Sequence, residues 1–143
     1  MKIEMLEGLI PATFTPMHQN GSLNLDLIDA YYEMLCKNNM QTIFICGTTG
    51  EGELLTMEER KRLAEKWIAV SKNNPSFKVI TVVGSNRITE AIELANHAAA
   101  HGSYGISYIT PYYYKPATID ALIDCCVQVS SAVPNLPFYY YHI

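Results

Sequence analysis

The chain has 143 residues, of which 49% are hydrophobic and 17% are charged, and its formal net charge is −4. This composition excludes a disordered or fibrous chain, and the absence of a basic excess argues against binding to nucleic acid. The sequence contains no apolar stretch long enough to span a bilayer, so we expect a soluble domain that does not cross a membrane.

The cysteines and the N-terminal residues indicate a reducing compartment. Cys125 and Cys126 are adjacent, Cys36 and Cys46 are isolated, and no C-x-x-C pair occurs. These spacings favour free thiols over a disulfide framework or a zinc site. The first eight residues, MKIEMLEG, lack the apolar core of a signal peptide, and we therefore expect a cytoplasmic protein.

Strand-like and helix-like segments alternate through the first half of the sequence. Residues 9–15 predict a strand, and Ile28, Tyr31, Tyr32 and Leu35 then recur at helical spacing. The apolar run Thr42–Cys46 predicts a second strand, which Gly47 ends. The next helix is expected to begin with a capping box formed by Thr56 and Glu59. Its inner face is expected to contain Leu63, Ala64, Trp67 and Val70.

The second half repeats this alternation. Three further strands are predicted, over Val79–Val83, Ile106–Ile109 and Leu136–Tyr141. Two helices lie between them, and Gly102 and Pro134 mark their ends. The apolar stripes of these helices are Ile88, Ala91, Ile92, Ala95 and Ala99, and then Ile119, Leu122, Ile123 and Cys126.

Strand–helix units that repeat about every 30 residues are typical of a parallel sheet. Two folds fit: a doubly wound, flavodoxin-like sheet, and a (β/α)₈ TIM barrel, which typically needs about 250 residues. A doubly wound domain normally closes with a helix over its last strand, whereas this sequence ends at Ile143 inside an apolar run. We therefore expect residues 1–143 to form the N-terminal half of a single (β/α)₈ domain, with its strands 1–5 and helices 1–4.

The segment GTTGE, residues 47–51, is the first candidate for binding chemistry. In either fold, ligands collect at the carboxyl ends of parallel strands, and this segment follows the second strand. Its two hydroxyls and closely spaced backbone N–H groups suit a carboxylate or a phosphate. An ordinary strand-to-helix turn explains the same five residues equally well.

Tyrosines and histidines provide further candidates. Six of the ten tyrosines form two triplets, Tyr112–Tyr114 and Tyr139–Tyr141. Strand alternation places Tyr139 and Tyr141 on one face, where a phenol at a barrel mouth needs a polar partner. His97 and His101 are four residues apart on one predicted helix and could ligate a metal, but without a third ligand in view we expect a solvated helix end and no metal site.

Four motifs in register carry a resemblance to a known family. GLIPATFTP (8–16), GTTGE (47–51), TPYYYKP (110–116) and PFYYYHI (137–143) occur in the order and spacing of the pyruvate-dependent class I aldolases. This superfamily includes dihydrodipicolinate synthase and N-acetylneuraminate lyase (sialic acid aldolase). PFYYYHI and the segment 8–21 most resemble the lyase branch.

The resemblance implies a (β/α)₈ barrel that cleaves N-acetylneuraminate (sialic acid) to N-acetylmannosamine and pyruvate through a lysine Schiff base. Carried over by position, Thr48 and Thr49 bind the keto-acid carboxylate, and Tyr141 relays the proton of the substrate's C4 hydroxyl. Tyr113 is the counterpart of a tyrosine that reaches a neighbouring subunit's site in bacterial relatives. The resemblance also implies a cytosolic homotetramer that uses neither a metal nor an organic cofactor.

The family's Schiff-base lysine lies on the sixth barrel strand, beyond the last residue of this sequence. Only Lys115 is expected at the functional edge, in an exposed loop where a solvated amine is poorly activated to attack a carbonyl. We therefore expect this N-terminal half to be inactive alone. Two alternatives stay open: a dihydrodipicolinate synthase-like or other 2-keto acid aldolase, and a non-enzymatic half-barrel or flavodoxin-like module in which GTTGE binds an anion.

Overall fold

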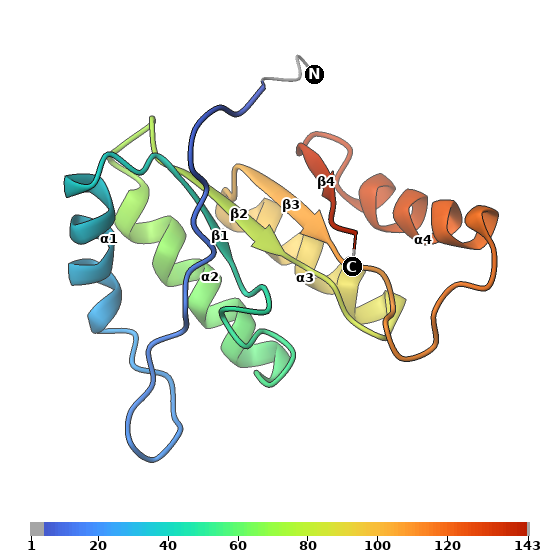
Figure 1. Cartoon of the computed structure of the whole chain (residues 1–143), viewed down its shortest axis with the longest axis horizontal. Coiled ribbons are helices and arrows are strands. Elements are labelled where there is room, and N and C mark those ends of the chain that lie inside the picture. The colour runs from blue at the N-terminus through green and yellow to red at the C-terminus, as the bar shows by residue number, and fades with distance from the viewer. Residues whose placement is uncertain (1–4, 143) are drawn as a thin grey trace.

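Helices and strands alternate along the computed structural model, which describes residues 5–142 (Figure 1). Within these residues the helices are α1 (Leu27–Lys37), α2 (Met57–Ser71), α3 (Ile88–His101) and α4 (Ile119–Ala132). The strands are β1 (Thr42–Ile45), β2 (Lys78–Val82), β3 (Gly105–Tyr108) and β4 (Phe138–Tyr140). In this part of the chain, no helix is both long enough and apolar enough to cross a membrane.

The strand order decides between the two folds that fit the sequence. The strands pair in parallel and in chain order, β1-β2-β3-β4. Crossovers between parallel strands are right-handed in almost all proteins, and here each new strand is added at the same edge, so the helices are expected to pack on the same face of the sheet. A doubly wound sheet would reverse its strand order and carry helices on both faces. The chain therefore has the sequential strand order of part of a (β/α)₈ barrel.

The first predicted strand, residues 9–15, forms only an isolated bridge. Ala12 pairs in parallel with Phe44. The backbone N–H of Thr13 donates to the carbonyl of Phe44 at 3.0 Å, and that of Phe44 donates to the carbonyl of Pro11 at 3.0 Å. Proline has no N–H to donate, so Pro11 and Pro16 prevent a longer ladder. The described residues thus hold four of the five predicted strands as regular strands, and the first as this bridge beside β1.

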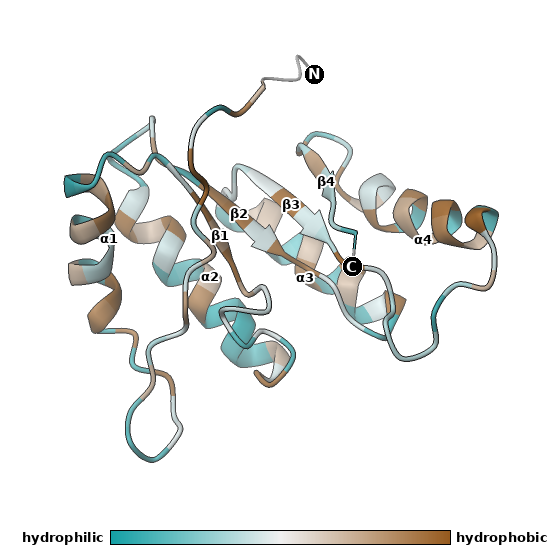
Figure 2. Ribbon diagram, in the orientation of Figure 1, coloured by the Kyte–Doolittle hydropathy of each residue, from teal (hydrophilic) through white to brown (hydrophobic). Residues whose placement is uncertain are grey.

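The helix-facing side of the sheet forms the core. Ile43 and Ile45 of β1 pack with Trp67 of α2 in one cluster. Ile106 and Tyr108 of β3 belong to a second cluster with α3 and α4. The predicted inner face of α2 is confirmed, since Leu63, Ala64 and Trp67 are buried and Val70 is partly buried against the same cluster. Figure 2 shows the matching pattern, with an apolar β1 and helices that alternate between apolar and polar residues.

Local signals at the helix ends are also confirmed. The backbone N–H of Glu59 donates to Oγ1 of Thr56 at 3.2 Å, and that of Thr56 donates to Oε2 of Glu59 at 2.9 Å. These two bonds are the predicted capping box of α2. Gly102 follows α3 with φ +91°, the left-handed conformation that glycine adopts most readily.

The opposite, concave face of the sheet is open. A hollow of about 730 Å³ lies on it, lined by side chains that include Phe44, Ile80, Tyr139 and Tyr141. Ser107 projects into the same hollow, and its buried hydroxyl has no hydrogen-bond partner among residues 5–142. In a closed barrel such inward side chains pack against those of the remaining strands.

The four cysteines are free thiols, as their spacing predicted. Cys46 is the most buried of them, at the carboxyl end of β1. Burial raises the pKa of its thiol to about 11, although the nearby Arg60 guanidinium acts in the opposite direction. The Cys46 thiol is therefore protonated at neutral pH and is a poor nucleophile.

Candidate active site

The loops that follow the strands gather at the carboxyl edge of the sheet, near the C-terminal end of the chain (Figure 1). They comprise residues 46–56 after β1, 83–87 after β2, 109–118 after β3, and 141–142 after β4. Ligands of parallel α/β folds bind at this edge. Three of the four motifs that the sequence singled out contribute residues to it.

The GTTGE loop is a tightly wound turn. Cys46, which precedes the loop, and Glu51, its last residue, have φ values of +59° and +52°, a conformation that non-glycine residues rarely adopt. Glycine is required at position 52, since a Cβ there would lie 2.0 Å from the carbonyl oxygen of Cys46. Strained backbone of this kind is concentrated at functional sites, where the surrounding structure holds it in place.

Residues near the N-terminus hold the loop from below. Oγ1 of the buried Thr15 donates to the carbonyl of Gly50 at 2.6 Å. A Cβ at Gly50 would lie 2.9 Å from the carbonyl oxygen of Thr13. The bridge beside β1 therefore fixes the position of the GTTGE loop, and this explains why Thr13 and Thr15 are buried.

Thr48 and Thr49 lie at the exposed tip of that loop. Neither hydroxyl is hydrogen-bonded to another of the described residues, so both can bind a ligand. Thr48 also lines a hollow of about 240 Å³ together with Glu53, Val82 and Tyr112. Hydroxyls and turn N–H groups that converge without bulky side chains suit a carboxylate.

Tyr141 directly follows β4 at the same edge of the sheet. Its backbone N–H donates to the carbonyl of Tyr108 at 3.0 Å, which extends the strand pairing by one residue. Tyr141 is 48% exposed and lines the concave hollow together with Tyr139 and Tyr140, so this hollow does not separate the two faces that strand alternation predicted. Tyr141 thus presents its phenol to the open interior of the sheet.

Phe44 lies between Tyr141 and the GTTGE loop. The ring centroids of Phe44 and Tyr141 are 5.9 Å apart, and a Cβ at Gly47 would lie 3.5 Å from Cδ1 of Phe44. The GTTGE loop and Tyr141, both predicted to bind substrate, therefore both lie next to Phe44 at the carboxyl edge of the sheet. They line different hollows of the described chain, because Thr48 faces the smaller one and Tyr141 the larger.

A buried arginine, which the sequence analysis missed, connects these loops. Arg60 of α2 is 4% exposed and donates through Nη1 to the carbonyl of Gly84 and through Nη2 to that of Val82, both at 2.9 Å. Its Nη1 lies 3.9 Å from Oε1 of Glu53. Its position in the sequence could have indicated this burial, because Arg60, Leu63 and Trp67 lie on the same face of the helix.

Glu53 extends this network to the loop after β3. It accepts a hydrogen bond from the hydroxyl of Tyr112 at 2.7 Å, and this bond, together with burial, raises the pKa of Tyr112. Oδ1 of Asn86 accepts from the backbone N–H groups of Tyr112 and Tyr113, at 3.2 and 3.0 Å. Charged and polar side chains thus join the loops after β1, β2 and β3.

Tyr113 and Lys115 lie farther from this centre. Tyr113 is 74% exposed and its ring contacts that of Tyr114 edge-on, at 4.8 Å between centroids. Lys115 is exposed and lines a separate hollow of about 300 Å³ beside α4. The structure therefore does not bring Lys115 into the hollow that Tyr141 lines.

Comparison with known proteins agrees with these features. Residues 5–143 match the model of the dihydrodipicolinate synthetase family. N-acetylneuraminate lyase A of Xenopus laevis is 46% identical over 139 residues, which are 96% of this chain and 45% of that protein. The chain thus spans less than half the length of this curated relative.

Solved structures share the fold over the same extent. Proteus mirabilis N-acetylneuraminate lyase superposes with a TM-score of 0.92 at 35% identity, covering 97% of this chain and 46% of its own. A dihydrodipicolinate synthase superposes with a TM-score of 0.88 at 36% identity, covering 96% of this chain and 46% of its own. Barrel aldolases therefore contain this arrangement of strands and helices as a little under half of their fold.

Proposed function

The chain belongs to the dihydrodipicolinate synthetase family, and on that basis we propose that it is part of an N-acetylneuraminate lyase. Such an enzyme cleaves sialic acid to N-acetylmannosamine and pyruvate. The high identity to the frog lyase along nearly the whole chain supports this choice of substrate. One observation supports the assignment of the site: Gly47, which directly precedes Thr48 and Thr49, and Tyr141 both lie beside Phe44 at the carboxyl edge. The two threonine hydroxyls have no hydrogen-bond partner among residues 5–142.

The carboxylate of the keto acid binds at the GTTGE loop. Thr48 and Thr49 donate their hydroxyl protons to it, and the turn N–H groups add further donors. Thr15 and the backbone near Thr13 support the loop from behind, so the donors are positioned before the substrate arrives. Bound there, the substrate extends its reacting carbons over Phe44 toward Tyr141.

Tyr141 acts as the proton relay. A lysine amine condenses with the C2 carbonyl of sialic acid and releases water, which forms an iminium. The C3–C4 bond then breaks and its electron pair moves toward the iminium. The phenol oxygen of Tyr141 accepts the proton of the C4 hydroxyl while its own phenolic proton passes to the substrate carboxylate. The lysine is provided by a barrel strand outside these 143 residues, because Lys115 is exposed and lies in another hollow.

The assembled enzyme is a cytoplasmic homotetramer in which these residues form the N-terminal half of a single barrel domain. The exposed Tyr113 contacts the site of a neighbouring subunit. A second candidate, a synthase-like 2-keto acid aldolase, is favoured by the 36% identity to a solved dihydrodipicolinate synthase. Both candidates form the same iminium with pyruvate and differ in the aldehyde that they accept or release.

A fusion of residues 1–143 to the C-terminal half of the frog lyase tests the proposal. Incubation with pyruvate and borohydride should give one stoichiometric lysine adduct in the appended half, detected by intact mass and peptide mapping. The fusion should also release pyruvate from N-acetylneuraminate. An adduct without sialic acid cleavage, accompanied by condensation of pyruvate with another aldehyde, would favour the synthase-like alternative.

The 143-residue chain is the matched control, and it should form no stoichiometric adduct. Lys115 is exposed and lies outside the hollow that Tyr141 lines, so no desolvated neighbourhood activates its amine toward a carbonyl. A stoichiometric adduct on this chain would contradict the proposed lysine assignment. If it mapped to Lys115, the active site would lie in the hollow beside α4.

Thr49→Val in the fusion should weaken binding of the keto acid. Valine keeps the shape of threonine but removes a donor to a carboxylate, and such bonds contribute about 1.5–3 kcal/mol, or roughly 10- to 100-fold in affinity. We expect KM to rise by this factor while kcat changes little. Thr56→Val, at the exposed cap of α2, is the control that should leave KM unchanged.

A further inference from the structure

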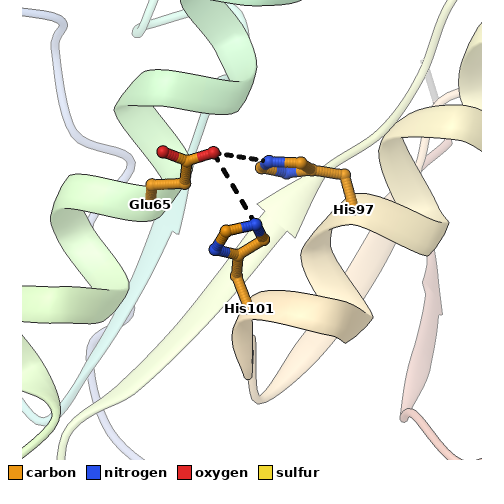
Figure 3. Close-up of side chains that lie close together, drawn as sticks. All are labelled: Glu65, His97 and His101. Carbon is orange, nitrogen blue, oxygen red and sulfur yellow. Dashed lines mark hydrogen bonds and ion pairs between the residues drawn. The ribbon is translucent and has the colours of Figure 1, made fainter.

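Helices α2 and α3 bring three potential metal ligands together on the outer face of the sheet, away from the candidate active site. Glu65 projects from α2, and His97 and His101 project from adjacent turns of α3 toward it (Figure 3). One ligand atom from each residue lies within 4.8 Å of the others. The sequence predicted a solvated helix end because no third ligand was in view. The structure provides one, Glu65.

The contacts converge on a single carboxylate oxygen. Oε1 of Glu65 lies 2.8 Å from Nε2 of His97 and 3.7 Å from Nε2 of His101. The side chain of His97 is 15% exposed, whereas those of His101 and Glu65 are 43% and 44% exposed. The cluster is therefore partly shielded on the His97 side and open to solvent on the other.

The helix packing explains this convergence. Residues four apart on a helix lie on the same face, so His97 and His101 present their rings side by side. Ala64 of α2 and the alanines of α3 at positions 91, 95 and 98 are buried, and such small side chains let the helices approach closely. The carboxylate of Glu65 can therefore reach both rings across the interface.

We propose that Glu65, His97 and His101 bind a zinc ion that cross-links α2 to α3. Two imidazole nitrogens and one carboxylate oxygen are a common protein ligand set for zinc, with a fourth position left to water. Glu65 and His101 also line a hollow of about 430 Å³, which gives that water room. The proposal is independent of the aldolase assignment.

Binding requires the hydrogen bond between Nε2 of His97 and Oε1 of Glu65 to open, with the Nε2 proton released to solvent or replaced by one on Nδ1. It also requires a small rearrangement of the imidazoles. The two rings are stacked, with centroids 4.3 Å apart and planes inclined by 28°. A nitrogen lone pair lies in the plane of its ring, so the more exposed ring of His101 must rotate for both Nε2 atoms to point at one ion. The open hollow beside His101 permits that rotation.

The cluster could instead serve only as a polar contact between the two helices. A neighbouring ion pair provides a control that distinguishes this role from zinc binding. Nζ of Lys61 on α2 lies 2.5 Å from Oε1 of Glu93 on α3, so this ion pair joins the same two helices without any histidine. Glu93→Gln therefore removes an interhelical contact and leaves the three proposed ligands intact. It is the matched control for variants of the cluster.

Zinc titration of the metal-stripped 143-residue chain, in competition with a chromophoric chelator, tests the proposal. We expect one ion per chain, with affinity at least about tenfold weaker in Glu65→Gln and in His101→Gln, since even outer-sphere changes cost about 10- to 100-fold. Glu93→Gln and His142→Gln should bind zinc as the unchanged chain does. Zinc should raise the melting temperature of the unchanged chain and the two controls but not of the ligand variants.

Cobalt substitution of the unchanged chain provides a second readout that needs no variant. Nitrogen and oxygen ligation should give visible d–d bands without the near-ultraviolet charge-transfer band of a cobalt–thiolate bond. A thiolate band would assign binding to cysteines and overturn the proposal. So would unaltered affinity in both ligand variants, or equally tight zinc binding by the chain unfolded in guanidinium.

Discussion

Tyr141→Phe should lower the rate of sialic acid cleavage by about 10²–10⁴-fold in the fusion that completes the barrel, the usual contribution of a positioned proton-transfer group. Phenylalanine keeps the ring that contacts Phe44 but removes the hydroxyl that accepts the C4 proton. Carboxylate binding at the GTTGE loop does not involve this hydroxyl. The pyruvate adduct should therefore still form, and the loss should appear in kcat rather than KM.

The readouts are steady-state cleavage and borohydride trapping on the same preparation. Tyr140→Phe is the matched control, because the Tyr140 hydroxyl interacts with Nδ1 of His142 at 2.9 Å and has no role in the proposed proton transfer. It should change the cleavage rate little. If Tyr141→Phe and Thr49→Val both had small and equal effects, neither residue would have its assigned role.

Arg60→Met should lower the free energy of unfolding by about 2–5 kcal/mol, because buried carbonyls that lose a charged donor cost about 1–3 kcal/mol each. Methionine fills much of the same space beside the core but cannot donate to the carbonyls of Val82 and Gly84. Removing the guanidinium also leaves Glu53 without its ion-pair partner. Natural domains are stable by only about 5–15 kcal/mol, so this loss is large.

Urea denaturation followed by circular dichroism measures this effect. Arg62→Met on the same helix is the control, because Arg62 is exposed and should cost less than about 0.5 kcal/mol. In the fusion, Arg60→Met should also raise KM for the keto acid, because Arg60 connects the loops that hold Glu53 and Tyr112. Equal destabilisation by the two methionine variants would show that the buried hydrogen bonds do not matter.

The sequence by itself determined the features that depend on local interactions. Strand and helix positions followed from periodicity, and the capping box of α2 followed from the spacing of Thr56 and Glu59. The GTTGE turn was predicted from its two glycines and from its position directly after the second strand. Local patterns suffice in these cases because each involves hydrogen bonds or side-chain directions within a few residues of the chain.

Pairings between distant segments were decided by the tertiary structure. Sequential strand order selected a barrel-like sheet over a doubly wound one, and prolines reduced the first predicted strand to a bridge. Arg60 reaches Gly84, and Glu65 reaches His97, across 24 and 32 residues of sequence. Periodicity shows which face of a helix is buried, but not which side chain of a neighbouring element meets it. That depends on strand order and on how closely helices pack, which arise only when the whole sheet and its helices assemble.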